Sequence, residues 1–82
     1  MVETEKVEEE IIEIIKDCMM EDEMQIKDDD HLVHDIGLDS IAFVDLSVQI
    51  ENKYNIHISD LEMMEIQTFG QLLLSVLKKR NR

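Results

Sequence analysis

One serine in this chain lies where a loop is expected to end and a strongly patterned helix to begin. Ser40 follows Asp39 in the segment Asp35–Ile41, DIGLDSI. The first turn of a helix has free N–H groups and the positive end of the helix dipole, which favour a bound phosphate. A hydroxyl in this position indicates a serine that another enzyme modifies. Ser40 or Asp39 could also simply cap the helix, because both residue types are common there.

A serine hydrolase is the main enzymatic alternative for Ser40. The three histidines and the many carboxylates could supply the partners of a catalytic triad. The chain lacks the Gly-x-Ser-x-Gly turn of such enzymes, however, and 82 residues leave little room for an oxyanion hole and a pocket. We therefore predict that the protein is not an enzyme.

Acidic and histidine side chains gather just before this serine and raise the question of a metal site. These residues are Asp28, Asp29, Asp30, His31, His34 and Asp35. An EF-hand loop starting at Asp28 fails because Leu32 occupies the third ligand position and position six is not glycine. The chain has a single cysteine, Cys18, so it cannot form a cysteine zinc site or an internal disulfide. We predict a solvated acidic loop and no metal.

Composition and charge narrow the range of partners. The formal net charge of −12 argues against binding to nucleic acid or to anionic lipid, and it favours basic protein partners. No apolar run approaches the roughly 20 residues that span a bilayer. We expect one small domain over residues 1–82, monomeric and cytoplasmic, without membrane insertion.

The elements that must position Ser40 are expected to be helices. The chain has no proline, two glycines and no alternating strand pattern, which predicts an all-α fold. We predict a small bundle of three main helices plus one short helix, with a long first loop. The predicted helices span about 5–19, 40–54, 60–65 and 69–80. Ser59 and Thr68 each begin a capping-box pattern that marks the start of the last two.

The predicted helix over 40–54 has apolar residues on two sides. One stripe consists of Phe43, Leu46, Ile50 and Tyr54. The opposite stripe consists of Ile41, Val44 and Val48. A small domain covers one such stripe easily and two with difficulty. The longer stripe is the better core candidate, so the shorter one is expected to be at least partly exposed as a contact surface. Burial of the shorter stripe under the first loop is the alternative.

These patterns together resemble the acyl carrier proteins. The residues that carry the resemblance are Leu32-Val33-His34-Asp35-Ile36-Gly37-Leu38-Asp39-Ser40-Ile41, Val44, Leu46, Ile50-Glu51, Tyr54 and Ile56-His57-Ile58. The likeness covers almost the whole chain, including the helix lengths, the long first loop and the acidity. It implies a non-catalytic carrier of acyl groups in fatty-acid, polyketide or related synthesis.

The resemblance implies roles for particular residues. Ser40 matches the serine that receives covalent 4'-phosphopantetheine from a separate phosphopantetheinyl transferase, and Asp39 matches the acid that positions this transferase and its magnesium. The remaining matches are contacts for the transferase and for acyl-loading and synthase enzymes: Ile41, Val44, Asp45, Val48 and Glu51. Asp45 and Glu51 are acidic contacts in this scheme, although both could equally be ordinary solvated charges.

The chain also departs from the family pattern. The departures are Ala42 in place of a frequent acid, Lys53, Ser59 in place of a frequent proline, and the basic run Lys78-Lys79-Arg80. They leave two alternatives open. One is a D-alanyl or peptidyl/aminoacyl carrier, and the other is an acidic adaptor that binds partners without any prosthetic group.

Overall fold

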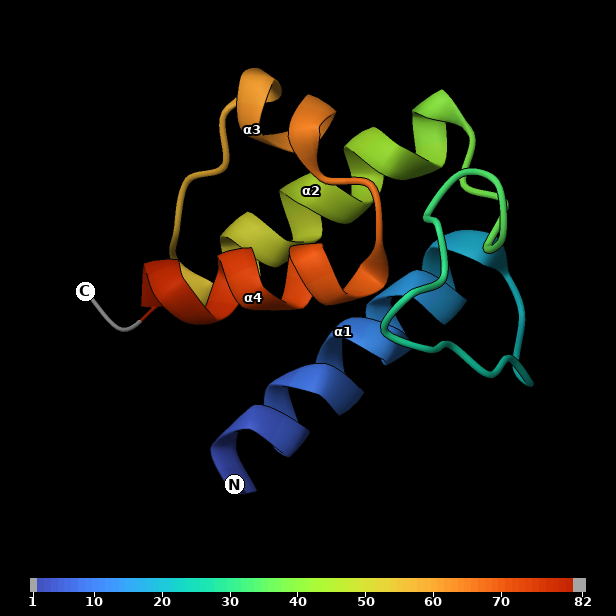
Figure 1. Ribbon diagram of the computed structural model, residues 1–82, viewed down its shortest axis with the longest axis horizontal. Helices are drawn as coiled ribbons and strands as arrows, with labels where there is room; N and C mark the ends of the chain where they lie inside the picture. Colours follow the sequence, from blue (N-terminus) through green and yellow to red (C-terminus); the bar gives the residue numbers. More distant parts are fainter. Residues whose placement is uncertain (1, 81–82) are drawn as a thin grey trace.

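Four α-helices dominate residues 2–80, the part of the chain that the computed structural model describes (Figure 1). They are α1 (Val2–Met19), α2 (Ser40–Tyr54), α3 (Asp60–Glu65) and α4 (Phe69–Arg80). The predicted all-α fold is confirmed, and α2, α3 and α4 have the predicted bounds. α1 begins three residues earlier than predicted, with Glu3 and Glu5 in its first turn, where the helix dipole favours acids.

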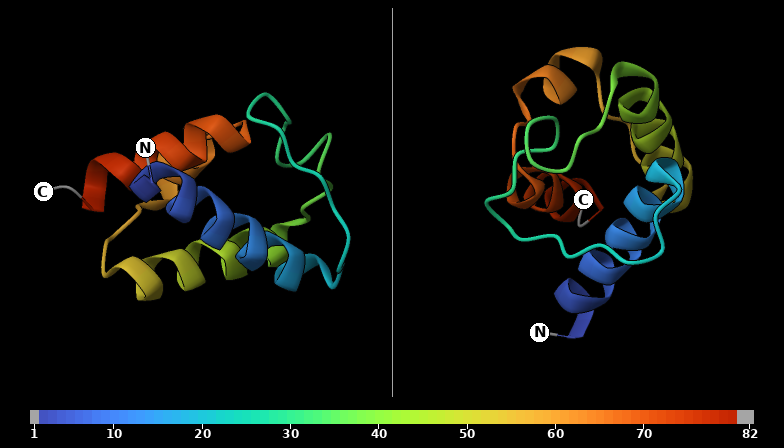
Figure 2. Two further views of the ribbon diagram at one scale, coloured as in Figure 1. Left: turned by 90° about the horizontal axis from the view of Figure 1, so that it is seen from below. Right: turned by 90° about the vertical axis from the view of Figure 1, so that its right-hand side faces the viewer.

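The helix α1 packs against both α2 and α4 (Figure 2). One apolar stripe of α1 is buried, and Cys18 at its end is half-buried. The buried residues of this stripe are Val7, Ile11, Ile14 and Ile15. The core also takes in side chains from α2, α4 and the first loop. Its most completely buried members are Val7, Ile11, Ile15, Leu32, Leu38, Leu46, Ile50, Phe69, Leu72 and Val76. No helix within residues 2–80 is both long and apolar enough to cross a membrane.

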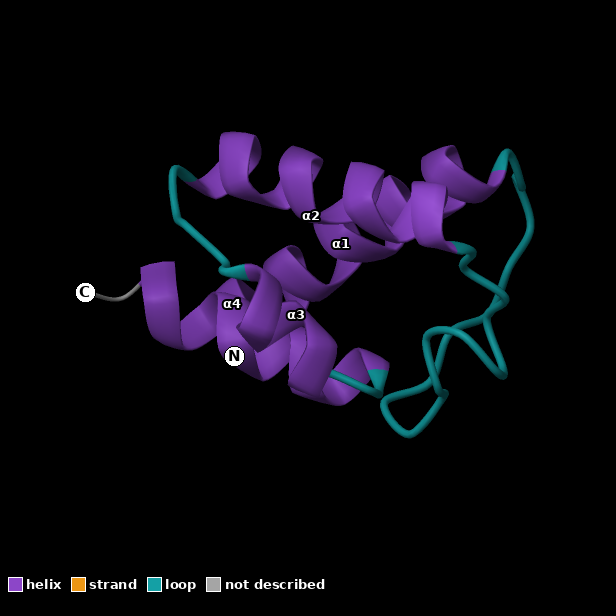
Figure 3. Ribbon diagram, turned by 90° about the horizontal axis from the view of Figure 1, so that it is seen from above, coloured by secondary structure: helices purple, strands orange, loops and turns teal. Residues whose placement is uncertain are grey.

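The long first loop, residues 20–39, is ordered against the start of α4 (Figure 3). The N–H groups of Phe69 and Gly70 donate to the carbonyl oxygens of Asp30 and Asp28, at 3.0 and 2.8 Å. These donors belong to the first turn of a helix, where no partner exists within the helix itself. Gly70 permits the close approach, because a Cβ atom there would lie 3.0 Å from the Asp28 oxygen. The loop thus completes α4 and is held by it.

The short helix α3 is fixed by the predicted capping box and by one ion pair. The Ser59 hydroxyl accepts the Glu62 N–H at 3.2 Å, and the Glu62 carboxylate accepts the Ser59 N–H at 3.0 Å. The same carboxylate lies 2.6 Å from Lys79 Nζ on α4. The Lys79 hydrogen bond, followed by the Ser59 N–H, lowers the pKa of Glu62 from 4.5 to about 2. Part of the basic run in α4 therefore serves to hold α3.

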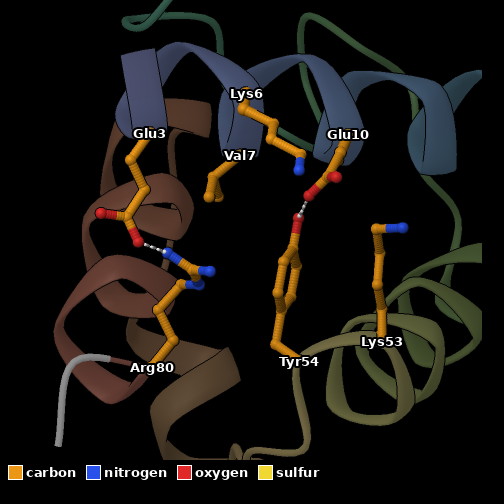
Figure 4. Close-up of a pocket in the computed structure, with 7 residues that line it drawn as sticks. All are labelled: Glu3, Lys6, Val7, Glu10, Lys53, Tyr54 and Arg80. Atoms are coloured by element: carbon orange, nitrogen blue, oxygen red, sulfur yellow. Dashed lines mark hydrogen bonds and ion pairs between the residues drawn. The ribbon is translucent and has the colours of Figure 1, made fainter. Parts of the chain in front are cut away.

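A polar cluster joins the first half of α1 to the C-terminal ends of α2 and α4 around a surface hollow (Figure 4). The Tyr54 hydroxyl of α2 donates to Glu10 of α1 at 2.7 Å. Arg80 of α4 pairs with Glu3 of α1. The Arg80 guanidinium also lies over the Tyr54 ring, 5.6 Å from its centre. Arg80, like Lys79, therefore has partners within the same molecule.

The ion pair between Glu62 and Lys79 predicts a specific dependence of stability on pH. The pKa of Glu62 is lower in the folded protein than in an unfolded chain, so the pair stabilises the fold above about pH 4.5 and this contribution is lost as pH falls toward 2. Lys79→Met should lower the free energy of unfolding by about 0.5 kcal/mol at pH 7. The deficit should shrink between pH 4.5 and 2, as measured by urea unfolding at each pH.

Lys78→Met is the matched control. Lys78 is exposed, and its substitution removes the same charge from the neighbouring position. Identical pH profiles for the two variants would contradict the assignment and would indicate a general charge effect.

Candidate functional site

Ser40 is the first residue of α2, and its side chain is exposed. Asp39 precedes it in extended conformation, with φ −86° and ψ 179°, and is the N-cap of the helix. Its Oδ1 accepts the N–H of Ala42 at 2.8 Å. The structure therefore assigns the capping role, which the sequence left open between the two residues, to Asp39. Ser40 is left with its hydroxyl in solvent at the positive end of the helix.

The residues just before Ser40 are anchored in the core. Leu32 and Leu38 are buried, and the Leu38 N–H donates to the Leu32 carbonyl at 3.0 Å. Gly37 between them has a φ of +95°, which strains any residue with a side chain. Apolar residues in an ordered loop are expected to pack, and Ile36 is buried, but Val33 is exposed. Ser40 is thus two residues away from a fixed point of the core.

The two apolar stripes of α2 have the predicted opposite environments. Leu46 and Ile50 are fully buried, and Phe43 and Tyr54 are half-buried against the core. The side chains of the second stripe are exposed: Ile41 by 80%, Val44 by 61% and Val48 by 45%. The first loop does not cover them. Three apolar side chains are therefore presented to solvent along the helix that begins at Ser40.

The two acidic candidates on α2 both have partners inside the molecule. The Asp45 Oδ2 atom accepts from the Cys18 thiol at 3.3 Å and from the Gln49 amide at 3.1 Å. The Glu51 Oε2 atom accepts the Ile58 N–H at 2.7 Å and lies 3.2 Å from His57 Nδ1. Glu51 thus fastens the connection between α2 and α3. Gln49 is a neighbour of Asp45 on the same helix, but the helix spacing gave no sign of Cys18, His57 or Ile58, which lie in other segments.

The contact between Asp45 and Cys18 alters the chemistry of the thiol. Partial burial raises the pKa of Cys18, and the hydrogen bond to Asp45 and the negative charges of Asp45 and Asp17 raise it further, to about 12. The thiolate is the nucleophilic form of cysteine. Cys18 therefore remains a protonated, weakly reactive thiol at neutral pH and packs as a small, half-buried side chain.

The residues around Ser40 fit a covalently attached phosphate group. The first turn of α2 contains no acidic residue, and the carboxylate of the preceding Asp39 is held in the cap. Free N–H groups and the dipole at this end stabilise negative charge. No group of three or more histidine, cysteine or acidic side chains that could hold a metal is found within residues 2–80. The arrangement offers an attachment point and a neighbouring contact surface.

Comparisons with known proteins agree with this arrangement. The family model described as the phosphopantetheine attachment site matches residues 9–75. The chain is 34% identical over 67 residues to the acyl carrier protein of Coprothermobacter proteolyticus, covering 82% of each chain. It is 28% identical over 79 residues to that of Thermotoga maritima, covering 96% of this chain and 98% of the relative.

A crystal structure of an acyl carrier protein from Thermotoga maritima has the same fold. The TM-score is 0.83 at 26% identity, and the match covers 96% of this chain and 92% of that one.

The hydrogen bond between Cys18 and Asp45 predicts a gain in thiol reactivity when the carboxylate is removed. Asp45→Asn should lower the pKa of Cys18, which we expect to give about tenfold more thiolate and faster alkylation by iodoacetamide at pH 8.5. Alkylation rates can be followed by mass spectrometry, with circular dichroism to verify the fold. Asp17→Asn, which removes only a more weakly acting charge, should give a smaller increase. Equal rates in the wild-type protein and Asp45→Asn would refute the assigned interaction.

Proposed function

This chain belongs to the acyl carrier protein family, and from that membership we propose that Ser40 is its 4'-phosphopantetheine attachment residue. Acyl carrier proteins are carriers and not enzymes, and their phosphopantetheine-binding domain bears the prosthetic group covalently. The group supplies a thiol that holds acyl chains as thioesters. The role of this chain is to present that thiol to enzymes that perform the chemistry.

The observation that carries the proposal is the exposure of Ser40 among the four serines of the chain. The other three are half-buried. The Ser47 hydroxyl donates to the Val44 carbonyl within α2 at 2.8 Å, and the Ser59 hydroxyl is part of the α3 capping box. Ser75 lies within α4. Ser40 alone combines an exposed hydroxyl with a helix N-terminus.

Asp39 is proposed to have two roles at this site. Its Oδ1 atom holds the first turn of α2 in place, so the position of Ser40 is defined before any partner binds. The cap uses only Oδ1 and does not need Oδ2. A carboxylate oxygen is a preferred ligand of magnesium. We propose that this second oxygen helps to position the transferase and its metal ion during modification of Ser40.

The exposed stripe of Ile41, Val44 and Val48 is proposed as the surface that partner enzymes contact. The stripe extends along α2 from the residue next to Ser40. An apolar surface of this kind buries well against an apolar surface on a partner. Asp45 is exposed beside the stripe and suits a basic partner residue, whereas the two contacts of Glu51 inside the fold favour a structural role for it. The proposed partners are a phosphopantetheinyl transferase and acyl-loading and synthase enzymes.

For the pathway, we propose a discrete shuttle in fatty-acid, polyketide or related synthesis. Relatives named acyl carrier protein support this over a D-alanyl or peptidyl carrier, although Ala42 and Lys53 make α2 less acidic than the family pattern. We also propose a cytoplasmic location, which the single free cysteine supports because free thiols are typical of reducing compartments.

Modification at Ser40 can be tested by mass measurement. Incubation of the protein with coenzyme A, magnesium and a promiscuous phosphopantetheinyl transferase should add the mass of one prosthetic group. Ser40→Ala should abolish the addition, whereas Ser75→Ala should not, since that serine lies within α4. An unmodified wild-type protein with several transferases would favour the acidic adaptor instead, and modification of Ser40→Ala would place the group elsewhere.

The docking role of the exposed stripe is tested by a charge on its last residue, Val48. Val48→Asp should slow loading by partner enzymes about five- to tenfold, as expected when one well-placed apolar contact is lost. The helical content should remain intact, because the Val48 side chain is 45% exposed. Leu46→Asp is the contrasting variant, since that side chain is fully buried and the charge should unfold the protein. A normally folded Val48→Asp that is loaded at the wild-type rate would rule out the stripe as a docking surface.

A further inference from the structure

The loop before Ser40 contains one turn that is capped by a histidine side chain. The N–H groups of Val33 and His34 both donate to His31 Nδ1, each at 3.1 Å. The N–H groups of Asp35 and Ile36 donate to the His31 carbonyl, each at 2.9 Å. In return, the Asp35 carboxylate accepts the His31 N–H at 2.7 Å. This reciprocal pattern resembles a capping box in which an imidazole replaces the usual hydroxyl.

The cap requires one particular protonation state of His31. A neutral imidazole has one acceptor nitrogen and one N–H donor, so acceptance at Nδ1 places the proton on Nε2. Protonation would turn Nδ1 into a third N–H donor facing two others. Both hydrogen bonds would then be lost. We propose that His31 is a pH-dependent clasp, closed when its ring is neutral and open when it is charged, for the loop that leads to Ser40.

Some ionisable groups around His31 oppose a positive charge on its ring, and others favour it. The ring of His34 lies 4.3 Å from that of His31 between centroids, so a charge on it would oppose protonation of His31. The carboxylate of Asp35 favours a charged ring, but it is already engaged by the His31 N–H. Asp30, the adjacent acid, accepts the Lys27 N–H at 2.9 Å. The opposing segment, which pairs with His31 at Thr68, has no ionisable side chain over residues 66–71.

The position of the turn connects the clasp to Ser40. The turn overlaps the segment between Leu32 and Leu38, which stay fixed because their side chains are buried and their backbones are bonded. Opening the clasp therefore frees the short segment of Val33 and His34 without unfolding the domain, because Asp35 and Ile36 remain bonded to the His31 carbonyl. This segment includes the exposed Val33 and lies close in sequence to Asp39 and Ser40. An enzyme that approaches Ser40 from the loop side would meet an ordered surface only while the clasp is closed.

Nuclear magnetic resonance of the full chain tests the clasp directly. At pH 8 the ring nitrogens of His31 should show the tautomer with the proton on Nε2. Between pH 8 and 5, the interval in which histidine changes charge, the amide signals of Val33 and His34 should shift with the same midpoint as the His31 ring. Their protection from hydrogen exchange, corrected for intrinsic rates, should fall about fivefold.

Three variants separate the clasp from other effects. His31→Asn keeps an acceptor oxygen at a similar distance from the backbone but does not titrate, so it should abolish the pH response of both amides. His34→Asn and the distant His57→Asn should retain it. The proton on Nδ1 at pH 8, or a response that persists in His31→Asn, would overturn the proposal.

The consequence for loading rests on the proposed attachment at Ser40 and has a separate readout. One transferase should be assayed with the wild-type protein and with His31→Asn at pH 7.5 and 5.5. The ratio of their rates cancels the pH dependence of the enzyme itself, and it should fall about threefold at the lower pH. A constant ratio would overturn the effect on loading. Absence of modification in both proteins would instead count against Ser40, while the amide titration decides the clasp.

Discussion

Burial of the α1 stripe against both α2 and α4 is the interaction on which the rest of the structure depends. Transfer of apolar side chains from water is the dominant favourable term in folding, and a chain of 82 residues has a single core in which to gain it. Because α1 and the core cover only the Leu46 and Ile50 side of α2, the Ile41, Val44 and Val48 side stays in water. The packing that stabilises the domain therefore also leaves an apolar surface beside Ser40.

Many acidic residues of the chain are solvated, but several also form contacts that stabilise the fold. Carboxylates fasten the segments that the small core does not hold: Asp39 caps α2, Asp35 closes the turn at His31, Glu51 secures the α2–α3 connection, and Glu62 joins α3 to α4. The basic residues Lys79 and Arg80 are engaged by Glu62 and Glu3. Hydrogen bonds to charged groups are stronger than those between neutral groups, which suits short helices and loops with little area to bury.

A carrier needs a fixed attachment point in water and little else from its own chain. The first loop meets this need through backbone bonds to α4 and through the buried Leu32 and Leu38, which fix the chain two residues before Ser40. The cap at Asp39 then sets the direction of α2. Such a hydroxyl needs only to be accessible, because members of this family leave the chemistry to partner enzymes.

The sequence by itself determined the features that arise from near neighbours. Helix bounds, the capping boxes at Ser59 and Thr68, the two stripes of α2 and the candidate at Ser40 depend on spacings of one to four residues along the chain, and these can be read directly. Tertiary structure alone decided the contact of Asp45 with Cys18, that of Glu51 with Ile58 and that of Lys79 with Glu62. The cap at His31 joins near neighbours, but histidine is not among the usual capping residues, so the sequence did not mark it. Cys18 and Asp45 are 27 positions apart, and only the packing of α1 on α2 brings them together. Local periodicity determines which face of a helix a side chain lies on. The group that it contacts on that face depends on how separate segments pack together.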